Sequence, residues 1–341
     1  MTDETERRKT IAVWLFVVAA MVVAMVILGG VTRLTQSGLS MVDWRPVTGW
    51  LPPFSEAEWE AVFARYRAYP EYQKNNLGMT LSEFKAIFWL EFLHRLWGRI
   101  IGLAFFVPLV VFAFKGWIAR PLAHKMIGLF VLGGLQGVMG WYMVKSGLVS
   151  RPDVSQYRLA AHFGLALAIL GFILWLAIGL LKPDAQDSGG SAFRRPAWAL
   201  LALVSLTAIS GAFVAGLDGG LTYNTFPLMD GQWVPDGLLD ISPVYLNFFE
   251  NIATVQFDHR VLAIATFLAV VIFWLKARSA VLTIRARKAV NVLLGVAIIQ
   301  LTLGISTLLL VVPVSLAALH QLGAVALFST AIWLVREFQG S

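Results

Sequence analysis

The chain has 341 residues, of which 58% are hydrophobic and 14% are charged, and it contains no cysteine. Soluble domains carry roughly 25% charged residues, so this composition predicts an integral membrane protein. The lack of cysteine excludes disulfides, thiolate metal sites and cysteine nucleophiles. The net charge of +7 does not indicate nucleic-acid binding, because the basic residues lie between apolar segments, where many of them act as topology signals.

Eight apolar segments are long enough to cross about 30 Å of hydrocarbon. The first has no obvious small-residue cleavage site and is therefore expected to be a span, not a signal peptide. The predicted spans are residues 11–30, 86–114, 126–144, 159–181, 197–217, 253–275, 289–312 and 314–335.

The distribution of basic residues predicts the orientation of these spans. Lys and Arg residues gather before the first span and in the connections after the second, fourth and sixth spans. Lys182 lies in the connection after the fourth. The connection from Asp218 to Asn251 carries five acidic residues and no Lys or Arg. Because Lys and Arg mark the cytoplasmic side, both termini are expected in the cytoplasm.

A long outer loop, residues 31–85, is expected to have its own structure. Ser55 and Glu58 form a capping box, and Thr80 and Glu83 form a second one that starts the helix of the second span. The first box precedes an amphipathic stripe of Trp59, Val62, Phe63 and Tyr66. This short helix is expected on the membrane surface, either as a packing cap or as a lid over a site beneath it.

The two halves of the chain resemble each other at an offset of about 160 to 180 residues. The fold class is therefore predicted to be all-α, with eight transmembrane helices in two repeated four-helix bundles, residues 1–182 and 183–341. The matching pairs are Glu91-Phe-Leu-His94-Arg95 with Gln256-Phe-Asp-His259-Arg260, Gln136-Gly-Val-Met-Gly140 with Gln300-Leu-Thr-Leu-Gly304, and Ser37-Gly-Leu-Ser40 with Gly219-Gly-Leu-Thr222.

Four of the five histidines, His94, His162, His259 and His320, lie inside even-numbered spans at a similar depth, roughly 5 to 12 Å from the outer face. The fifth, His124, lies in a basic cytoplasmic connection and is expected to be solvated. A single intramembrane histidine can simply make an interhelical hydrogen bond. Two per half, facing each other across a bundle, instead predict bis-imidazole haem ligation. Zinc or copper would normally require more ligands.

Residues near these histidines agree with a flat macrocycle. One turn after each histidine stands a small residue: Gly98, Ala166, Ala263 and Ala324. Arg95 and Arg260 directly follow their histidines, and an arginine at this depth needs a partner. That partner is either a haem propionate or an acidic neighbour, Glu91 or Asp258.

One position makes the two halves unequal. Glu91 lies three residues before His94 and on the same helix face, whereas Gln256 occupies the matching position. A carboxylate at this depth is costly and indicates a function, such as accepting a proton or orienting a water. The structural alternative is an ion pair with Arg95.

These motifs, together with Gly29-Gly-Val-Thr-Arg33-Leu-Thr and His320-Gln321, resemble the haem A synthase family along nearly the whole chain. The lack of cysteines is similar to the proteobacterial and mitochondrial branch. The resemblance implies that the C8 methyl of haem O is oxidised by successive hydroxylations, with water-derived oxygen, to the formyl of haem A. It also implies a bacterial inner-membrane location, and as partners haem O synthase and cytochrome c oxidase assembly factors.

Carried over by residue, the resemblance assigns His94 and His162 to the haem O iron, with Glu91 as the catalytic carboxylate. It assigns His259 and His320 to a permanent haem b, the first acceptor of the electrons, followed by an unidentified acceptor. Homo-oligomerisation remains open. Two other classes are alternatives: a di-haem b-type cytochrome exchanging electrons with quinone, and a haem transporter or chaperone.

Overall fold

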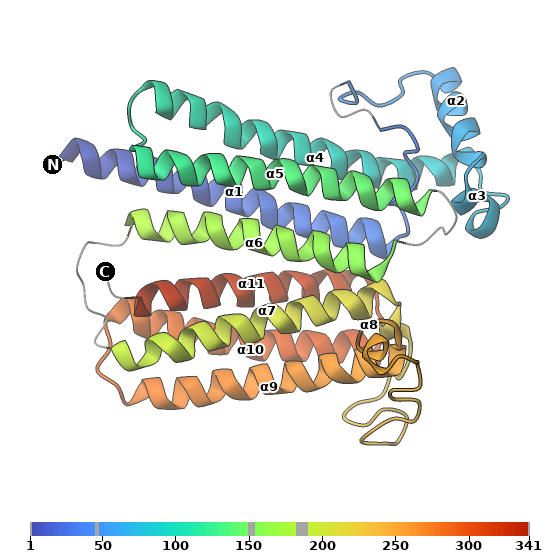
Figure 1. The fold of residues 1–341 in the computed structure, drawn as a ribbon. Coiled ribbons are helices and arrows are strands. Elements are labelled where there is room, and N and C mark those ends of the chain that lie inside the picture. The colour runs from blue at the N-terminus through green and yellow to red at the C-terminus, as the bar shows by residue number, and fades with distance from the viewer. Residues whose placement is uncertain (1, 45–47, 149–153, 182–189, 340–341) are drawn as a thin grey trace. The chain divides into compact units, whose positions relative to one another are not determined.

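The computed structural model describes residues 2–44, 48–148, 154–181 and 190–339. Within these ranges, eight helices are long and apolar enough to cross a membrane, which confirms the expected number of spans (Figure 1). The chain is a multi-pass membrane protein. The eight helices are α1 (Thr2–Leu34), α4 (Leu81–Phe114), α5 (Arg120–Gly147), α6 (Gln156–Leu181), α7 (Arg194–Gly216), α9 (Ile252–Arg278), α10 (Ile284–Leu309) and α11 (Val314–Phe338).

Two helix ends differ from the sequence-based expectation. Helix α5 begins at Arg120, well before the predicted start, because Pro121 is favourable in the first turn of a helix. His124 is therefore a helical residue, and it is exposed. Helix α10 ends at Leu309 because Val311 and Val312 adopt positive φ angles of 58° and 56°, which no right-handed helix contains.

The chain divides into two compact units, Met1–Ala19 with Leu167–Ser341, and Ala20–Ala166. Each is described by itself below. The predicted boundary between the halves, with Lys182 next to it, falls in residues 182–189, outside the described ranges. The division into residues 1–182 and 183–341 therefore stays a prediction.

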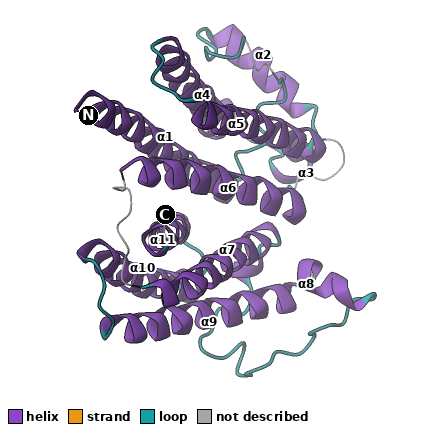
Figure 2. Cartoon of the chain, turned by 60° about the vertical axis from the view of Figure 1, so that its left-hand side comes forward, coloured by secondary structure: helices purple, strands orange, loops and turns teal. Residues whose placement is uncertain are grey.

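In the first unit, four helices form a closed bundle (Figure 2). Helix α7 packs against α9 and α11, and α10 packs against the same two helices. Helices α9 and α11 consequently lie opposite each other across the core. Short helices η1 (Ser191–Phe193), η2 (Gly219–Leu221), η3 (Val244–Leu246) and α8 (Asn247–Glu250) occupy the connections before and after α7.

In the second unit, α4 packs along α5, and the indole Nε1 of Trp97 on α4 donates to the carbonyl of Met21 on α1 at 2.9 Å. Helix α4 has 34 residues and is about 51 Å long, more than the roughly 30 Å that the hydrocarbon requires. Its first turns are therefore available to pack against the outer loop.

The outer loop contains α2 (Glu56–Arg67) and α3 (Pro70–Asn75). Both predicted capping boxes are present, at Ser55 with Glu58 and at Thr80 with Glu83. The predicted stripe of α2 packs on the first turns of α4 in an aromatic cluster, where the rings of Phe63 and Phe84 stack at 4.9 Å. The buried members of this cluster are Trp59, Phe63, Tyr66, Phe84, Phe88 and Phe92.

Candidate functional site

Each of the four intramembrane histidines lies against a glycine of a neighbouring helix. A Cβ atom added to Gly29 would lie 3.3 Å from the ring of His94, and one added to Gly140 would lie 3.3 Å from that of His162. The corresponding distances are 3.0 Å from Gly211 to His259 and 2.8 Å from Gly304 to His320. The absence of a side chain at these four positions therefore provides the space in which the rings sit.

Each unit contains two of the four histidines on different helices. His94 lies on α4 and His162 on α6 in the second unit, and His259 lies on α9 and His320 on α11 in the first. The second pair lies on the two helices that face each other across the bundle of the first unit. Two histidines in each unit are what the predicted bis-imidazole sites require.

The polar surroundings of the rings leave ligand atoms available. Nδ1 of His162 and Nδ1 of His320 are buried without a hydrogen-bond partner among the described residues. The amide of Gln136 lies 3.3 Å from Nε2 of His162, so a metal bound at that nitrogen would displace it. Within the described part of the chain, no three His, Asp or Glu side chains gather as metal ligands. The donor set therefore fits a metal that already carries in-plane ligands, as haem iron does.

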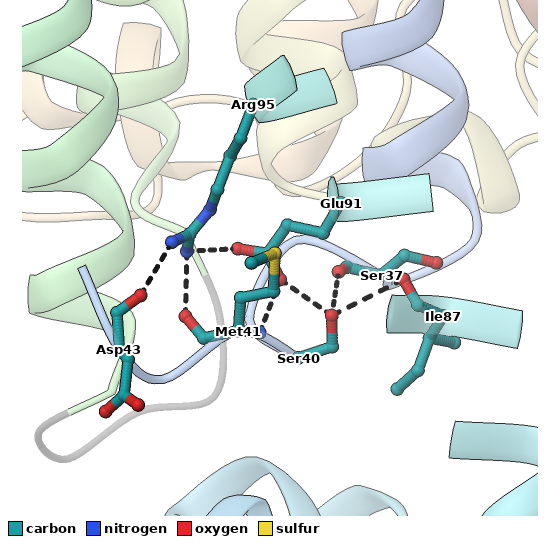
Figure 3. A network of polar contacts seen from close by, with 7 residues as sticks. All are labelled: Ser37, Ser40, Met41, Asp43, Ile87, Glu91 and Arg95. Atoms are coloured by element: carbon teal, nitrogen blue, oxygen red, sulfur yellow. Dashed lines mark hydrogen bonds and ion pairs between the residues drawn. The ribbon is translucent and has the colours of Figure 1, made fainter. Parts of the chain in front are cut away.

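Glu91 is the centre of a polar network between α4 and the segment that follows α1 (Figure 3). Its side chain is buried, and one carboxylate oxygen accepts hydrogen bonds from Ser40 Oγ and the backbone N–H of Met41, both at 2.7 Å. The other oxygen accepts from Arg95 at 2.5 Å. Arg95 also donates to the carbonyls of Met41 and Asp43, so the pair fastens the outer segment to the helix.

Gln256 makes the matching network, but its amide nitrogen is a donor where one carboxylate oxygen of Glu91 is an acceptor. Its amide nitrogen donates to the carbonyl of Gly219 at 2.7 Å and to that of Thr222 at 2.5 Å. Its oxygen accepts from Arg260, which also donates to the carbonyls of Tyr223 and Thr225. Matched positions thus contact matched positions in the two halves, which supports the predicted repeat.

The two networks identify partners for the arginines. Arg95 forms the ion pair with Glu91 that the sequence offered as an alternative to a propionate contact. Arg260 donates to Gln256 and to loop carbonyls, and among the described residues it makes no ion pair with Asp258. Its Nε is buried there without a hydrogen-bond partner. Arg260 therefore keeps one donor for a further acceptor.

The four glycines opposite the histidines were not singled out as functional residues from sequence. Three of them lie in motifs that the sequence did single out, at Gly29, Gly140 and Gly304, but sequence alone does not say what a helical glycine faces. The small residues one turn after the histidines say less about the space around the rings. An added Cβ at Gly98, for example, would meet the Met25 methyl group at 3.2 Å and no histidine atom.

Together, the fold and the site define a helical multi-pass membrane protein with paired intramembrane histidines and one buried carboxylate beside a single pair. Residues 12–332 match the COX15-CtaA family, described as cytochrome oxidase assembly protein. The chain belongs to this family.

Its relatives include bacterial and mammalian proteins. Heme A synthase of Nitrosospira multiformis is 54% identical over 335 residues, covering 97% of this chain and 94% of the relative. Heme A synthase of Parvibaculum lavamentivorans is 50% identical over 327 residues, covering 96% and 94%. Heme A synthase COX15 of Bos taurus is 48% identical over 335 residues, covering 96% and 81%.

Proposed function

We propose that this protein is a haem A synthase, an oxidoreductase that converts haem O to haem A by oxidising the C8 methyl group to a formyl group. One observation carries the proposal beyond the names of the relatives. The two histidine pairs have unequal surroundings, with an acceptor carboxylate near His94 and a donor amide near His259. An electron-transfer cytochrome has no need of this difference, whereas an enzyme that alters one haem and keeps the other does.

In this proposal, His94 and His162 bind the iron of the substrate, haem O, and His259 and His320 bind a permanent haem b. The glycines facing all four rings support this assignment, and so do the Nδ1 atoms of His162 and His320, which have no hydrogen-bond partner in the described part of the chain. When bound, haem b supplies one-electron redox chemistry. The next electron acceptor is unidentified.

Glu91 is the residue that handles protons in the first half. Oxidation of a methyl to a formyl with water as oxygen source releases protons and electrons in equal number, so a proton acceptor is needed near the reacting group. Glu91 is three residues from His94 and shares its helix face. Arg95 and Ser40 hold the carboxylate in one orientation, which fixes the direction in which it can accept a proton or orient a water.

The arginines complete the site at the outer face. Arg260 has a buried Nε without a partner among the described residues, which supports a contact with a haem b propionate. Arg95 is engaged through Nη2 with Glu91 and the carbonyl of Met41, and through Nη1 with the carbonyl of Asp43. The N–H groups outside these three bonds are assigned to a propionate of the substrate. The chain is assigned to the bacterial inner membrane with both termini in the cytoplasm. Its partners are then a haem O synthase that supplies the substrate and the cytochrome c oxidase assembly factors that receive haem A.

Extraction and mass analysis of the haems bound to the purified protein test this function. A haem A synthase contains haem b together with haem O or haem A. Two equivalents of haem b without farnesylated haem would contradict the proposal and favour the di-haem cytochrome. Bound haem O that is never converted to haem A in cells would favour a transporter or chaperone.

Glu91→Gln tests the role of the carboxylate. This variant reproduces the residue of the matching position and removes the proton acceptor, so we expect it to bind haem O and accumulate little haem A. Glu337→Gln is the matched control, because Glu337 is a buried carboxylate of α11 that pairs with Arg285 instead of lying beside His94. Normal haem A content in Glu91→Gln would remove Glu91 as a catalytic residue.

A further inference from the structure

The two halves also differ at the residue before the glycine that faces the first histidine of each pair. Ser210 precedes Gly211 on α7, whereas Leu28 precedes Gly29 on α1. The hydroxyl of Ser210 lies 2.8 Å from Nδ1 of His259. A leucine cannot make this contact with His94.

The proton of the serine hydroxyl determines the direction of this hydrogen bond. Ser210 Oγ donates to the backbone carbonyl of Thr207 at 2.8 Å. A hydroxyl has one proton and two lone pairs, so with its proton on that carbonyl it is an acceptor for Nδ1–H of His259. The backbone of Thr207 also hydrogen-bonds the imidazole, and this contact favours the same protonated Nδ1. The neutral imidazole then carries its proton on Nδ1 and a free lone pair on Nε2, the form that binds a metal through Nε2.

We propose that Ser210 is a positioning residue for the haem b site, which orients the imidazole of His259 and fixes its tautomer so that Nε2 is the ligand atom. The inference rests on the proposed function, since it takes His259 as a ligand of haem b. It adds a residue that acts through the ligand without touching the haem. In metal sites, such a partner of the second imidazole nitrogen orients the ring and raises its basicity.

The ring of His259 turns Cε1 toward Gly211. A Cβ at Gly211 would lie 3.0 Å from Cε1, and 3.5 and 3.6 Å from Nδ1 and Nε2. Ser210 bonds to Nδ1, so Nε2 is the nitrogen that is left for the iron.

Ser210→Ala in the full-length protein tests the proposal through two readouts besides activity. The first is the transfer of haem b to excess apomyoglobin, which we expect to be about 10- to 100-fold more favourable in the variant, as for other partners of metal-binding histidines. The second is the midpoint potential of haem b, which we expect to rise because a less basic imidazole stabilises the ferric state less. Ser210→Thr keeps the hydroxyl and should restore both values towards those of the wild type.

Ser205→Ala is the matched control, because Ser205 lies on the same helix and its hydroxyl bonds to the carbonyl of Leu201 instead of to a histidine. It should leave both readouts unchanged. Potential and haem retention of Ser210→Ala equal to those of Ser205→Ala would overturn the proposal, and so would a folded Ser210→Thr that behaves like Ser210→Ala. His259→Ala tests the ligand assignment apart from the role of Ser210. If this variant kept haem b, His259 would not be a ligand of the iron.

Discussion

Gly304→Ala tests whether the imidazole of His320 needs the space that the missing side chain of Gly304 leaves on α10. The added Cβ would lie 2.8 Å from Cε1 of the ring, whereas carbon atoms in contact are about 3.5 to 4.0 Å apart. The ring or the helix must therefore move by the better part of an ångström. Overpacking of this kind costs about 1 to 3 kcal/mol, against a gain of about 0.8 to 1.0 kcal/mol in helix propensity over glycine.

The four glycines form a graded series. The distance from the added Cβ to the ring is shortest at Gly304, followed by Gly211 at 3.0 Å, and it is 3.3 Å at Gly29 and Gly140. We expect Gly304→Ala to lose most of the haem of its own site, and the loss to diminish in the same order along the series.

The assay is the haem content of each purified variant by extraction, together with its thermal unfolding. Gly295→Ala is the control, because it lies on the same helix and a Cβ there meets no atom within 4 Å. It should keep the haem and gain stability from helix propensity alone. If Gly304→Ala matched Gly295→Ala in both haem content and unfolding temperature, the steric argument would be refuted.

Three further predictions concern stability away from the histidines. Glu337→Gln should lower the free energy of unfolding by about 1 to 3 kcal/mol, because the buried carboxylate accepts from Nη2 of Arg285 at 3.1 Å; chemical denaturation in detergent measures this, and an unchanged midpoint would contradict it. Ser55→Ala should weaken α2 by about 1 kcal/mol, seen as faster amide exchange confined to that helix. Backbone N–H groups at Phe54 and Ser55 hold the pKa of the Glu58 carboxylate below its usual 4.5. Helix α2 should therefore be fully stabilised above pH 4.5 and should loosen as the pH falls through the lower pKa of the folded state. Amide exchange of α2 that did not change with pH, after correction for intrinsic rates, would argue against the capping box.

Much of this architecture was predictable because membrane spans have a strong sequence signal. All eight spans were found from apolar length, and both capping boxes from residue type and spacing. Helix ends were less certain, since an apolar run does not show where the backbone leaves the helix. The residues of the seventh connection are apolar throughout, so the left-handed turn at Val311 and Val312 has no signal in composition.

The site was predictable as a set of residues but not as a set of contacts. The histidines and Glu91 stood out because polar residues are rare inside spans. Their partners did not, because a helical glycine or serine looks the same whether it faces lipid or an imidazole. The contact of Ser210 with His259 depends on how α7 and α9 pack, which a single sequence does not encode in any local pattern.

The central claim is that the two histidine pairs hold different haems. Mass analysis of the haems extracted from His94→Ala and His259→Ala, purified from the same cells, tests it most directly. The account predicts that His94→Ala loses the farnesylated haem and keeps haem b, while His259→Ala loses haem b. If both variants lost the same haem, or each kept both kinds, the two pairs would not be the separate sites described here.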